Sequence, residues 1–130
     1  MVIDTSAILA ILLGQRDAPA FAEAIEQADD RRISAANYLG AALVIDNHGD
    51  PIARREFDRF FDRSRIEIEP VTAELARIAR QAHQDFGRGR HRAALNFGDC
   101  LAYALARSLD QPLLYKGSDF SHTDVRSAIE

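Results

Sequence analysis

The sequence predicts an α/β fold, a three-layer sandwich in which helices flank a mainly parallel central sheet. Short apolar segments typical of buried strands alternate along the chain with longer segments whose apolar residues recur at helical spacing. This alternation favours parallel strands joined by helical crossovers. The 130 residues contain no repeat, low-complexity segment or linker, so we expect a single domain over residues 1–130.

The composition is that of an ordinary globular protein, with 47% hydrophobic and 28% charged residues. No apolar run approaches the length of a membrane span and no leader-like segment opens the chain, so we expect a cytoplasmic protein without membrane contact. Its single cysteine, Cys100, cannot form an internal disulfide, which fits a reducing compartment. The net charge of -4 excludes a generally basic nucleic-acid binder but leaves room for a local basic cluster.

The first half of the chain predicts two strands and four helices. In order, we expect a strand at residues 2–4, a helix at 7–13, a helix after Asp17, a strand at 32–34, a helix from Ser34 to about Asn47 and a helix from Pro51 to about Arg63. Thr5 or Ser6 can cap the first helix. The third helix is expected to bury an apolar face formed by Tyr38, Leu39, Ala42, Leu43 and Ile45.

The second half predicts two further strands and two further helices. In order, we expect an edge strand around Ile66 and Ile68, a helix capped by Thr72, a helix at residues 96–109, a strand at 113–116, and a polar turn at 118–123. Asn96 can cap the helix that follows it, which places Asp99 near the third helical position. Residues 124–130 read as a frayed end or a short strand.

Three carboxylates stand at the ends of these apolar elements. Asp4 ends the first strand, Asp99 lies in the first turn of an apolar helix, and Asp119 follows the last strand. Ligands of parallel sheets gather beyond the carboxyl ends of the strands, so these acids could converge on one site for a hard divalent cation. For Asp99 alone, a capping acid that complements the helix dipole is the simpler interpretation. The scattered histidines and lone cysteine offer no zinc site.

Three stretches together resemble the PIN domain, and in particular the VapC toxins of bacterial VapBC toxin–antitoxin systems. They are residues 1–7 (MVIDTSA), residues 96–106 (NFGDCLAYALA) and residues 114–120 (LYKGSDF). They occur in the expected order and span essentially the whole chain. Each stretch alone is a weak signal, whereas the three together in a chain this short are specific.

The resemblance implies an endoribonuclease, a toxin that uses Mg²⁺ or Mn²⁺ to cleave phosphodiester bonds of RNA, often tRNA or rRNA. It also implies a cognate VapB-like antitoxin that holds the toxin inactive, and assembly as a homodimer and a larger toxin–antitoxin complex. By position, Asp4 and Asp99 would be the metal-binding acids, and Asp119 a later catalytic acid that supports the metal. Thr5 or Ser6 would be an auxiliary polar group.

The family pattern also includes a glutamate in the helix after the second strand, and Gly40 stands at that catalytic position. Glycine inside a helix costs about 1 kcal/mol relative to alanine. Three explanations are open: a selected or engineered lesion, natural divergence, or replacement of the carboxylate by another group, with Asn37 as the best candidate. All three predict weakened metal binding and reduced cleavage. Alternatively, Gly40 only allows close packing against another helix.

Other segments have two interpretations each. Arg88, Arg90 and Arg92 form a basic loop that could steer RNA toward the acids, or could simply be solvated. The almost wholly apolar helix at residues 8–13 is either deeply buried or part of a partner groove. The aromatic residues at 57, 60 and 61 fit a core, or a surface for an antitoxin, better than they fit base stacking.

Two alternatives to an active ribonuclease follow. The first is a catalytically inactive PIN domain that binds antitoxin or RNA without cleavage. The second is a phosphatase of the haloacid-dehalogenase type, which also begins with a strand and an aspartate. That class needs a second aspartate two positions later, where this chain has Ser6.

Overall fold

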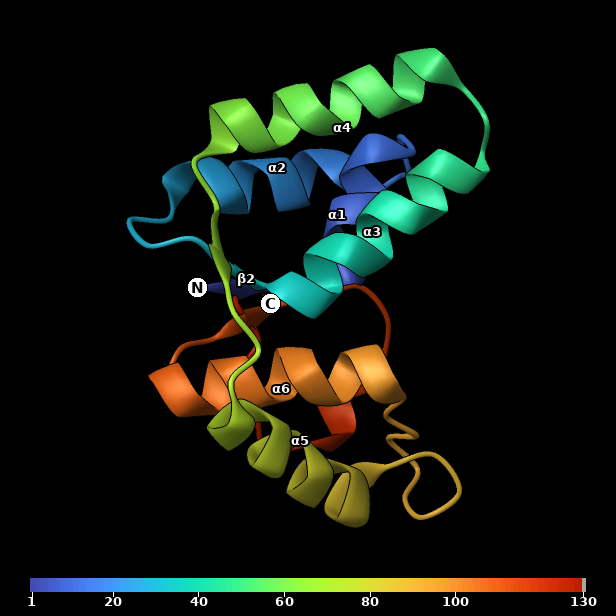
Figure 1. Ribbon diagram of the computed structural model, residues 1–130. Coiled ribbons are helices and arrows are strands. Elements are labelled where there is room, and N and C mark those ends of the chain that lie inside the picture. The colour runs from blue at the N-terminus through green and yellow to red at the C-terminus, as the bar shows by residue number, and fades with distance from the viewer. Residues whose placement is uncertain (130) are drawn as a thin grey trace.

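The fold is described by a computed structural model of residues 1–129 (Figure 1). Its centre is a four-stranded sheet within this range, formed by β1 (Val2–Ile3), β2 (Arg32–Ser34), β3 (Glu67–Glu69) and β4 (Leu113–Leu114). The strand order is β3-β2-β1-β4, and every pair is parallel. The predicted α/β sandwich with a parallel sheet is therefore confirmed, and β3 lies at an edge of the sheet as expected.

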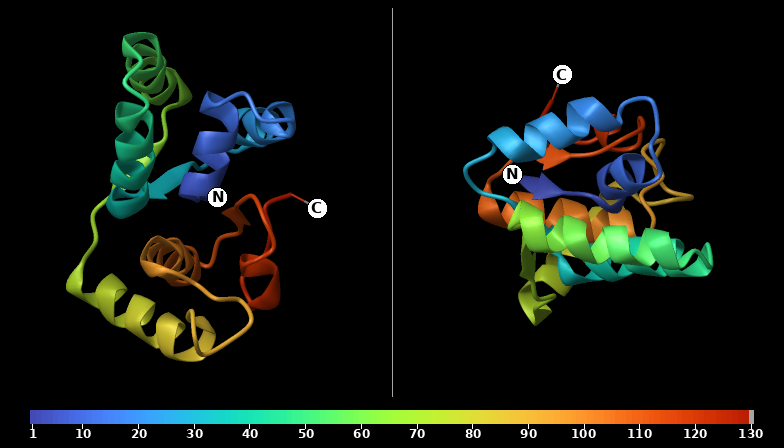
Figure 2. Two further views of the ribbon diagram at one scale, coloured as in Figure 1. Left: turned by 90° about the vertical axis from the view of Figure 1, so that its right-hand side faces the viewer. Right: turned by 90° about the horizontal axis from the view of Figure 1, so that it is seen from above.

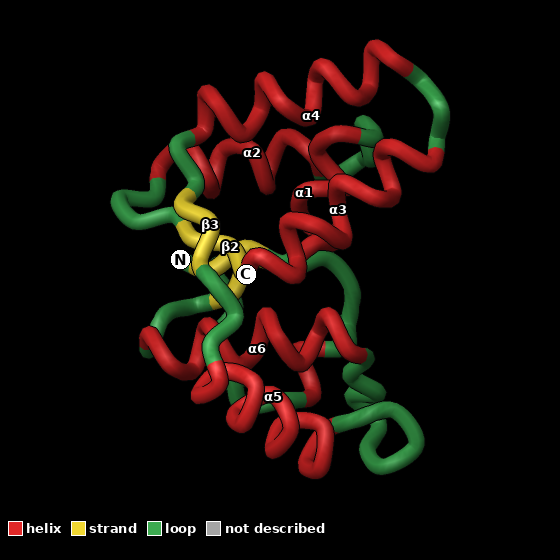
Figure 3. The backbone as a smooth tube through the Cα atoms, viewed as in Figure 1, coloured by secondary structure: helices red, strands yellow, loops and turns green. Residues whose placement is uncertain are grey.

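The helices lie on both sides of the strands (Figures 2 and 3). They are α1 (Thr5–Leu12), α2 (Ala18–Gln27), α3 (Ala35–Asn47), α4 (Pro51–Ser64), α5 (Ala73–Phe86) and α6 (Phe97–Leu109), followed by the short 3₁₀ helix η1 (Phe120–His122). The helices α1 to α4 group on one side, and α5 packs against α6 on the other. This arrangement gives the three layers.

The core is divided by the sheet into two apolar clusters. Successive side chains of a strand point to opposite faces, so neighbouring residues of β1 enter different clusters. Val2 packs with α6, and Ile3 packs with the helices of the first half. In β4, Leu113 and Leu114 divide in the same way. All four side chains are fully buried.

Most helix starts follow the predicted caps, with exceptions at α1 and α2. The side chains of Ser34, Asp50, Thr72 and Asn96 accept hydrogen bonds from the first turns of their helices. The expected cap of the first helix, Thr5 or Ser6, is wrong because the Asp4 side chain accepts the capping bond from the Ser6 backbone. The helix therefore begins two residues earlier than expected. Asp17 precedes α2 but makes no side-chain capping bond.

The predicted buried face of α3 is wrong in part. Asn37, Ala41 and Ile45 face the core, whereas Leu39 and Leu43 are 54% and 50% exposed. The buried residues are four positions apart, as one face of a helix requires. Apolar residues surround α3 almost completely, so the pattern alone did not select the face.

The C-terminal segment lies beside the last strand. Leu113 donates a backbone hydrogen bond to Arg126 and accepts one from Ala128, and a parallel bridge joins Leu113 to Ser127. A short strand-like pairing is therefore present, and β4 itself is shorter than the expected 113–116. Glu130, the last residue of the predicted frayed end or short strand at 124–130, is outside the described residues. None of the helices in residues 1–129 is long and apolar enough to span a bilayer.

Candidate active site

A cavity of about 660 Å³ opens where β1 and β2 end. Its walls come from the start of α1, one side of α3 and the start of α6. Because the strands are parallel, their carboxyl ends meet here, which is where ligands of such sheets gather. Of the residues predicted for the site, Asp4, Thr5, Ser6, Gly40 and Asp99 all line this cavity.

Asp4 is the most enclosed charged group of the cavity, with 4% of its surface exposed. Its Oδ2 atom accepts hydrogen bonds from the Ser6 backbone at 3.0 Å and the Ser6 hydroxyl at 2.6 Å. Burial, with a smaller contribution from the charge of Asp99, raises the pKa of Asp4 to about 6, although the bonds from Ser6 act in the opposite direction. Two negative charges close enough to disfavour each other form a site that a cation would stabilise.

Ser6 connects Asp4 to the segment after the last strand. Its hydroxyl donates to Asp4 and accepts a 2.9 Å hydrogen bond from the backbone N–H of Lys116. The sequence pattern suggested a role for Ser6 beside a metal or phosphate. In the structure its hydroxyl orients the Asp4 carboxylate.

Asp99 lies at the third position of α6 and completes a capping box. The Asn96 side chain accepts from the Asp99 backbone at 2.9 Å, and Asp99 Oδ2 accepts from the Asn96 backbone at 3.1 Å. Burial raises the pKa of Asp99, Asp119 raises it further, and the Asn96 bond and the charge of Arg88 lower it. Asp99 is thus a capping residue and also a cavity acid, since capping uses only one of its two oxygens.

Asp119 lies outside the walls of the cavity. It is exposed, immediately precedes η1, and acts on Asp99 through its charge. In the part of the chain that the structure describes, no group of three or more His, Cys, Asp or Glu side chains is placed to hold a metal ion. The cavity therefore contains two of the three predicted acids.

Asn37 joins α3 to the start of α6. Its Nδ2 atom donates a 3.1 Å hydrogen bond to the backbone carbonyl of Gly98, one residue before Asp99. This bond fixes which way the amide points. The Oδ1 atom is buried and has no hydrogen-bond partner in the described structure. Thr5 donates to the Asn37 backbone carbonyl at 2.9 Å, so its hydroxyl also ties α1 to α3.

Gly40 leaves open space on the cavity wall. A Cβ atom at this position would lie 3.5 Å from Thr5 Oγ1, which is ordinary van der Waals contact. Close packing does not require glycine at residue 40, so that alternative for Gly40 is wrong. A larger side chain would extend from α3 into the cavity that holds Asp4 and Asp99.

The basic loop lies next to α6. Arg88, Arg90 and Arg92 are all exposed. Of these three, Arg88 is near enough for its charge to lower the pKa of Asp99. The sequence reasoning passed over Phe97, which lines the cavity beside Asp99 with 80% of its surface exposed. The sequence could have indicated this residue, because Phe97 directly precedes Gly98 and Asp99 in the stretch at residues 96–106.

Comparison with known proteins assigns the fold to a family. The PIN domain family matches residues 1–126. The chain belongs to the PIN-domain family. Relatives of this PIN domain in Mycobacterium tuberculosis include ribonuclease VapC28, which is 51% identical over 131 residues covering 100% of this chain and 98% of the relative. Ribonuclease VapC30 is 48% identical, covering 96% of this chain and 95% of the relative.

Solved structures have the same fold. Mycobacterium tuberculosis VapC20, a toxin that cleaves the sarcin-ricin loop, superposes with a TM-score of 0.75 over 95% of both chains at 17% identity. A toxin–antitoxin complex from Klebsiella pneumoniae gives a TM-score of 0.72 at 17% identity, covering 99% of this chain and 98% of the other. These likenesses confirm the PIN-like architecture predicted from the sequence.

The donor set of this PIN domain fits a hydrated divalent cation. Mg²⁺ is usually bound through one or two carboxylates and keeps several of its waters. Asp4 and Asp99 provide two carboxylates whose pKa values are raised by burial and by negative neighbours. The unpartnered Oδ1 atom of Asn37 adds a neutral oxygen on the same cavity.

Proposed function

We propose that this chain is the toxin of a VapBC-type pair and an endoribonuclease that depends on Mg²⁺ or Mn²⁺, with activity weakened at Gly40. The observation that carries the proposal is the placement of Asp4 and Asp99 in one cavity at the carboxyl edge of the sheet. The family and the names of the relatives, which are ribonucleases, support it.

Asp4 and Asp99 would hold the cation, which supplies Lewis acidity at a phosphate oxygen and lowers the pKa of a bound water. Ser6 keeps the Asp4 carboxylate in one orientation, and Asn96 does the same for Asp99. Asp119 acts from outside the cavity as a further negative charge near Asp99. Arg88 is placed to attract the phosphate backbone of RNA, and Arg90 and Arg92 extend the basic surface of the loop.

Gly40 is the expected weak point of this site. A glutamate there would add a third carboxylate to the cavity, and the contact with Thr5 leaves room for its Cβ atom. With only two acids enclosed, we expect a cation to bind more weakly than it would with a third. Cleavage would fall with occupancy of the site.

Cleavage of total cellular RNA by the unchanged chain, Gly40→Glu and Gly40→Ala, each with Mg²⁺, Mn²⁺ or EDTA, tests the proposal. We expect cutting that EDTA abolishes and that is strongest for Gly40→Glu. Gly40→Ala controls for the change in helix stability because it adds no carboxylate. Equal cutting by all three proteins would show that Gly40 does not weaken the enzyme.

A PIN domain that binds without cleaving is the second candidate function. The absence of a side chain at Gly40, on the wall of the acid cavity, favours it. Under this alternative, Gly40→Glu would not cut RNA with either metal, while binding of a VapB-like antitoxin or RNA would persist. The cleavage assay therefore separates the two functions.

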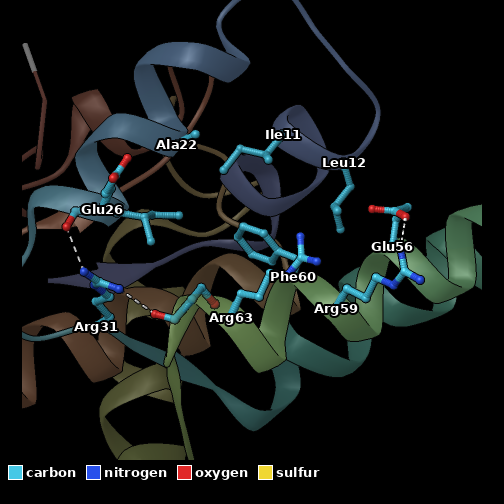
Figure 4. A pocket seen from close by; sticks show the side chains of 11 residues that line it. Ile11, Leu12, Ala22, Glu26, Arg31, Glu56, Arg59, Phe60 and Arg63 are labelled. Atoms are coloured by element: carbon cyan, nitrogen blue, oxygen red, sulfur yellow. Dashed lines mark hydrogen bonds and ion pairs between the residues drawn. The ribbon is translucent and has the colours of Figure 1, made fainter.

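A second hollow is the proposed seat of the antitoxin (Figure 4). It lies between α1, α2 and α4, with Ile11, Leu12 and Phe60 on its floor. Three arginines (Arg31, Arg59 and Arg63) and two glutamates (Glu26 and Glu56) also line it, and Glu56 pairs with Arg59. An antitoxin segment with apolar and acidic side chains would match this lining. On α1, Ala7, Ile8 and Ala10 are buried, whereas Ile11 and Leu12 are half-buried and line this hollow.

Charge reversal tests this seat. Arg59→Glu with Arg63→Glu should weaken binding of the cognate antitoxin by at least tenfold while cleavage by the toxin is unchanged. Arg77→Glu, on the exposed surface of α5, is the matched control. Unchanged affinity in the double variant would place the antitoxin elsewhere.

We also propose that two copies of the chain associate. Leu39, Leu43 and Val44 are exposed on α3, and a set of exposed apolar side chains on one helix is typical of an interface. Sedimentation of the purified chain, and of Val44→Asp, measures this directly. A monomer at all concentrations would contradict the proposal.

A further inference from the structure

Phe97 is exposed to an unusual degree for an aromatic residue. It is the first residue of α6, and 80% of its surface is open, more than for any other large hydrophobic residue in the described chain. Single exposed apolar residues are common on proteins, so exposure alone indicates no site. What distinguishes Phe97 is that two hollows meet at its ring.

The first of these hollows is the cavity that holds Asp4 and Asp99. The second is a mainly apolar groove of about 420 Å³ between α5 and α6, within the range of small-molecule sites. Its apolar lining includes Val71, Ala79 and Leu101, its one cationic side chain is Arg80, and His83 adds an imidazole. The ring of Phe97 therefore stands between the acid cavity and a groove with an apolar floor and one cationic side chain.

We infer that Phe97 and this groove bind a nucleobase of single-stranded RNA that flanks the phosphate at the acid cavity. Aromatic rings on protein surfaces bind unpaired bases by stacking, and the flat ring of phenylalanine serves every base. Arg80 would meet the adjoining phosphate from the α5 side, and Arg88 from the basic loop. The inference rests on the proposed function because it needs RNA at the acids.

A base fits the groove better than a second copy of this chain does. The one charged side chain that lines the groove, Arg80, is basic, so it matches a polyanion, whereas a second copy carries a net charge of -4 spread over both signs. Phe97 lines both the groove and the proposed catalytic cavity, so a strand of RNA bound at the acids lies within reach of the ring. A protein partner has no such need to enter the cavity.

The chain contains no tryptophan, which gives a direct probe. Phe97→Trp keeps a flat aromatic ring and introduces the sole tryptophan at the proposed site. In EDTA, where no cleavage is expected, a short single-stranded RNA of mixed sequence should quench its fluorescence in a saturable manner. Ile52→Trp, on the exposed surface of α4, is the control and should not respond.

Affinity supplies the second readout. Anisotropy of labelled RNA should show about tenfold weaker binding to Phe97→Leu than to the unchanged chain or Phe97→Trp, as expected for the loss of one stacked base. Circular dichroism checks that Phe97→Leu is folded, which its exposed position favours. Because these assays need no catalysis, they test base binding separately from the nuclease proposal.

Three results would overturn the inference. The first is equal RNA affinity for Phe97→Leu and the unchanged chain, or no RNA binding by either. The second is RNA binding that leaves the fluorescence of Phe97→Trp unaltered. The third is a fluorescence change with protein concentration alone, together with loss of the dimer in Phe97→Leu, because the ring would then belong to an interface between copies. Base binding that persists while Gly40→Glu cuts no RNA would instead contradict only the nuclease proposal.

Discussion

The hydroxyl of Ser6 donates a 2.6 Å hydrogen bond to the buried carboxylate of Asp4. The same hydroxyl accepts a hydrogen bond from the backbone N–H of Lys116. The orientation of the acid therefore depends on a contact between the segment that follows β1 and the segment that follows β4. Hydrogen bonds to a carboxylate favour its charged form. Ser6 therefore keeps the pKa of Asp4 lower than burial alone would make it.

We expect Ser6→Ala to raise the pKa of Asp4 because the side-chain bond is lost while the backbone bond remains. A hydrogen bond to a charged group contributes about 1.5–3 kcal/mol, so the midpoint should move upward by about one pH unit or more. Carbon-detected NMR titration of the aspartate carboxyl groups measures the change.

Ser108→Ala is the matched control for this titration, because Ser108 is exposed on α6 and does not line the acid cavity. We expect its Asp4 midpoint to equal that of the unchanged chain. A midpoint that is equally unchanged in Ser6→Ala would mean that the hydroxyl does not act on Asp4 in solution.

The metal-free protein should lose stability as pH rises through about 6. Asp4 has a pKa of about 6 in the folded chain and an ordinary value of 3.8, so folding favours its protonated form. The stability from this proton is fully present below the ordinary pKa and is lost above the folded one, by roughly 3 kcal/mol in total. Asp99 acts in the same direction.

Urea unfolding at about pH 5 and about pH 8 measures the part of this loss that falls in that interval, about 1.4 kcal/mol. Mn²⁺ should restore stability at the higher pH and have little effect at the lower one, where Asp4 is protonated. Asp4→Asn should lose less stability over this interval, because only the contribution of Asp99 remains, and should gain less from Mn²⁺. Stability that increases over this interval in the unchanged chain would be inconsistent with a buried, ionising Asp4.

The sequence was sufficient to predict the layers and most helix starts, because these depend on local chemistry. Ser34, Asp50, Thr72 and Asn96 are short polar residues before apolar helical patterns, and each makes the expected cap. The start of α1 was missed because Asp4 ends a strand and caps a helix at once. Because Asp4 follows an apolar strand directly, the sequence pattern placed it in the strand and hid its role as a helix cap.

The arrangement of the acids was less predictable, because it depends on the path of loops. Asp4 and Asp99 are fixed by a strand end and a capping box, and both line the cavity. Asp119 follows Gly117, whose φ of +102° turns the chain into a conformation that side chains rarely adopt. No spacing rule gives the position of a residue beyond such a turn. The buried face of α3 was unpredictable because its apolar residues surround the helix.

Gly40→Ala should stabilise the fold by about 1 kcal/mol through helix propensity, because the added Cβ meets Thr5 at ordinary contact distance. Gly40→Glu should gain less without metal, since its charge would join those of Asp4 and Asp99. Adding Mn²⁺ should raise the melting temperature of Gly40→Glu more than that of Gly40→Ala. Thermal unfolding with and without Mn²⁺ measures both effects.

The reverse order in Mn²⁺ would show that a carboxylate at residue 40 does not reach the cation. A loss of stability in Gly40→Ala would show that the helix needs glycine there after all, against the open contact with Thr5.

Asn37 offers a test of whether α3 still presents an oxygen to the cation. Asn37→Asp replaces the amide N–H that bonds to Gly98 by a carboxylate oxygen and adds a charge beside the other acids. Without metal we expect a loss of about 2–3 kcal/mol, because a buried polar group loses its partner and a charge is enclosed. With Mn²⁺ part of this loss should be recovered, because the new carboxylate can bind the ion.

Asn37→Ala provides the comparison, because it removes the same bond to Gly98 without adding a charge. Its stability should fall by a similar or smaller amount, and Mn²⁺ should recover little of it. If the gain in melting temperature with Mn²⁺ is the same for both variants and the unchanged chain, the Oδ1 atom of Asn37 does not face the cation. The third explanation for Gly40, replacement of the missing carboxylate by Asn37, would then be excluded.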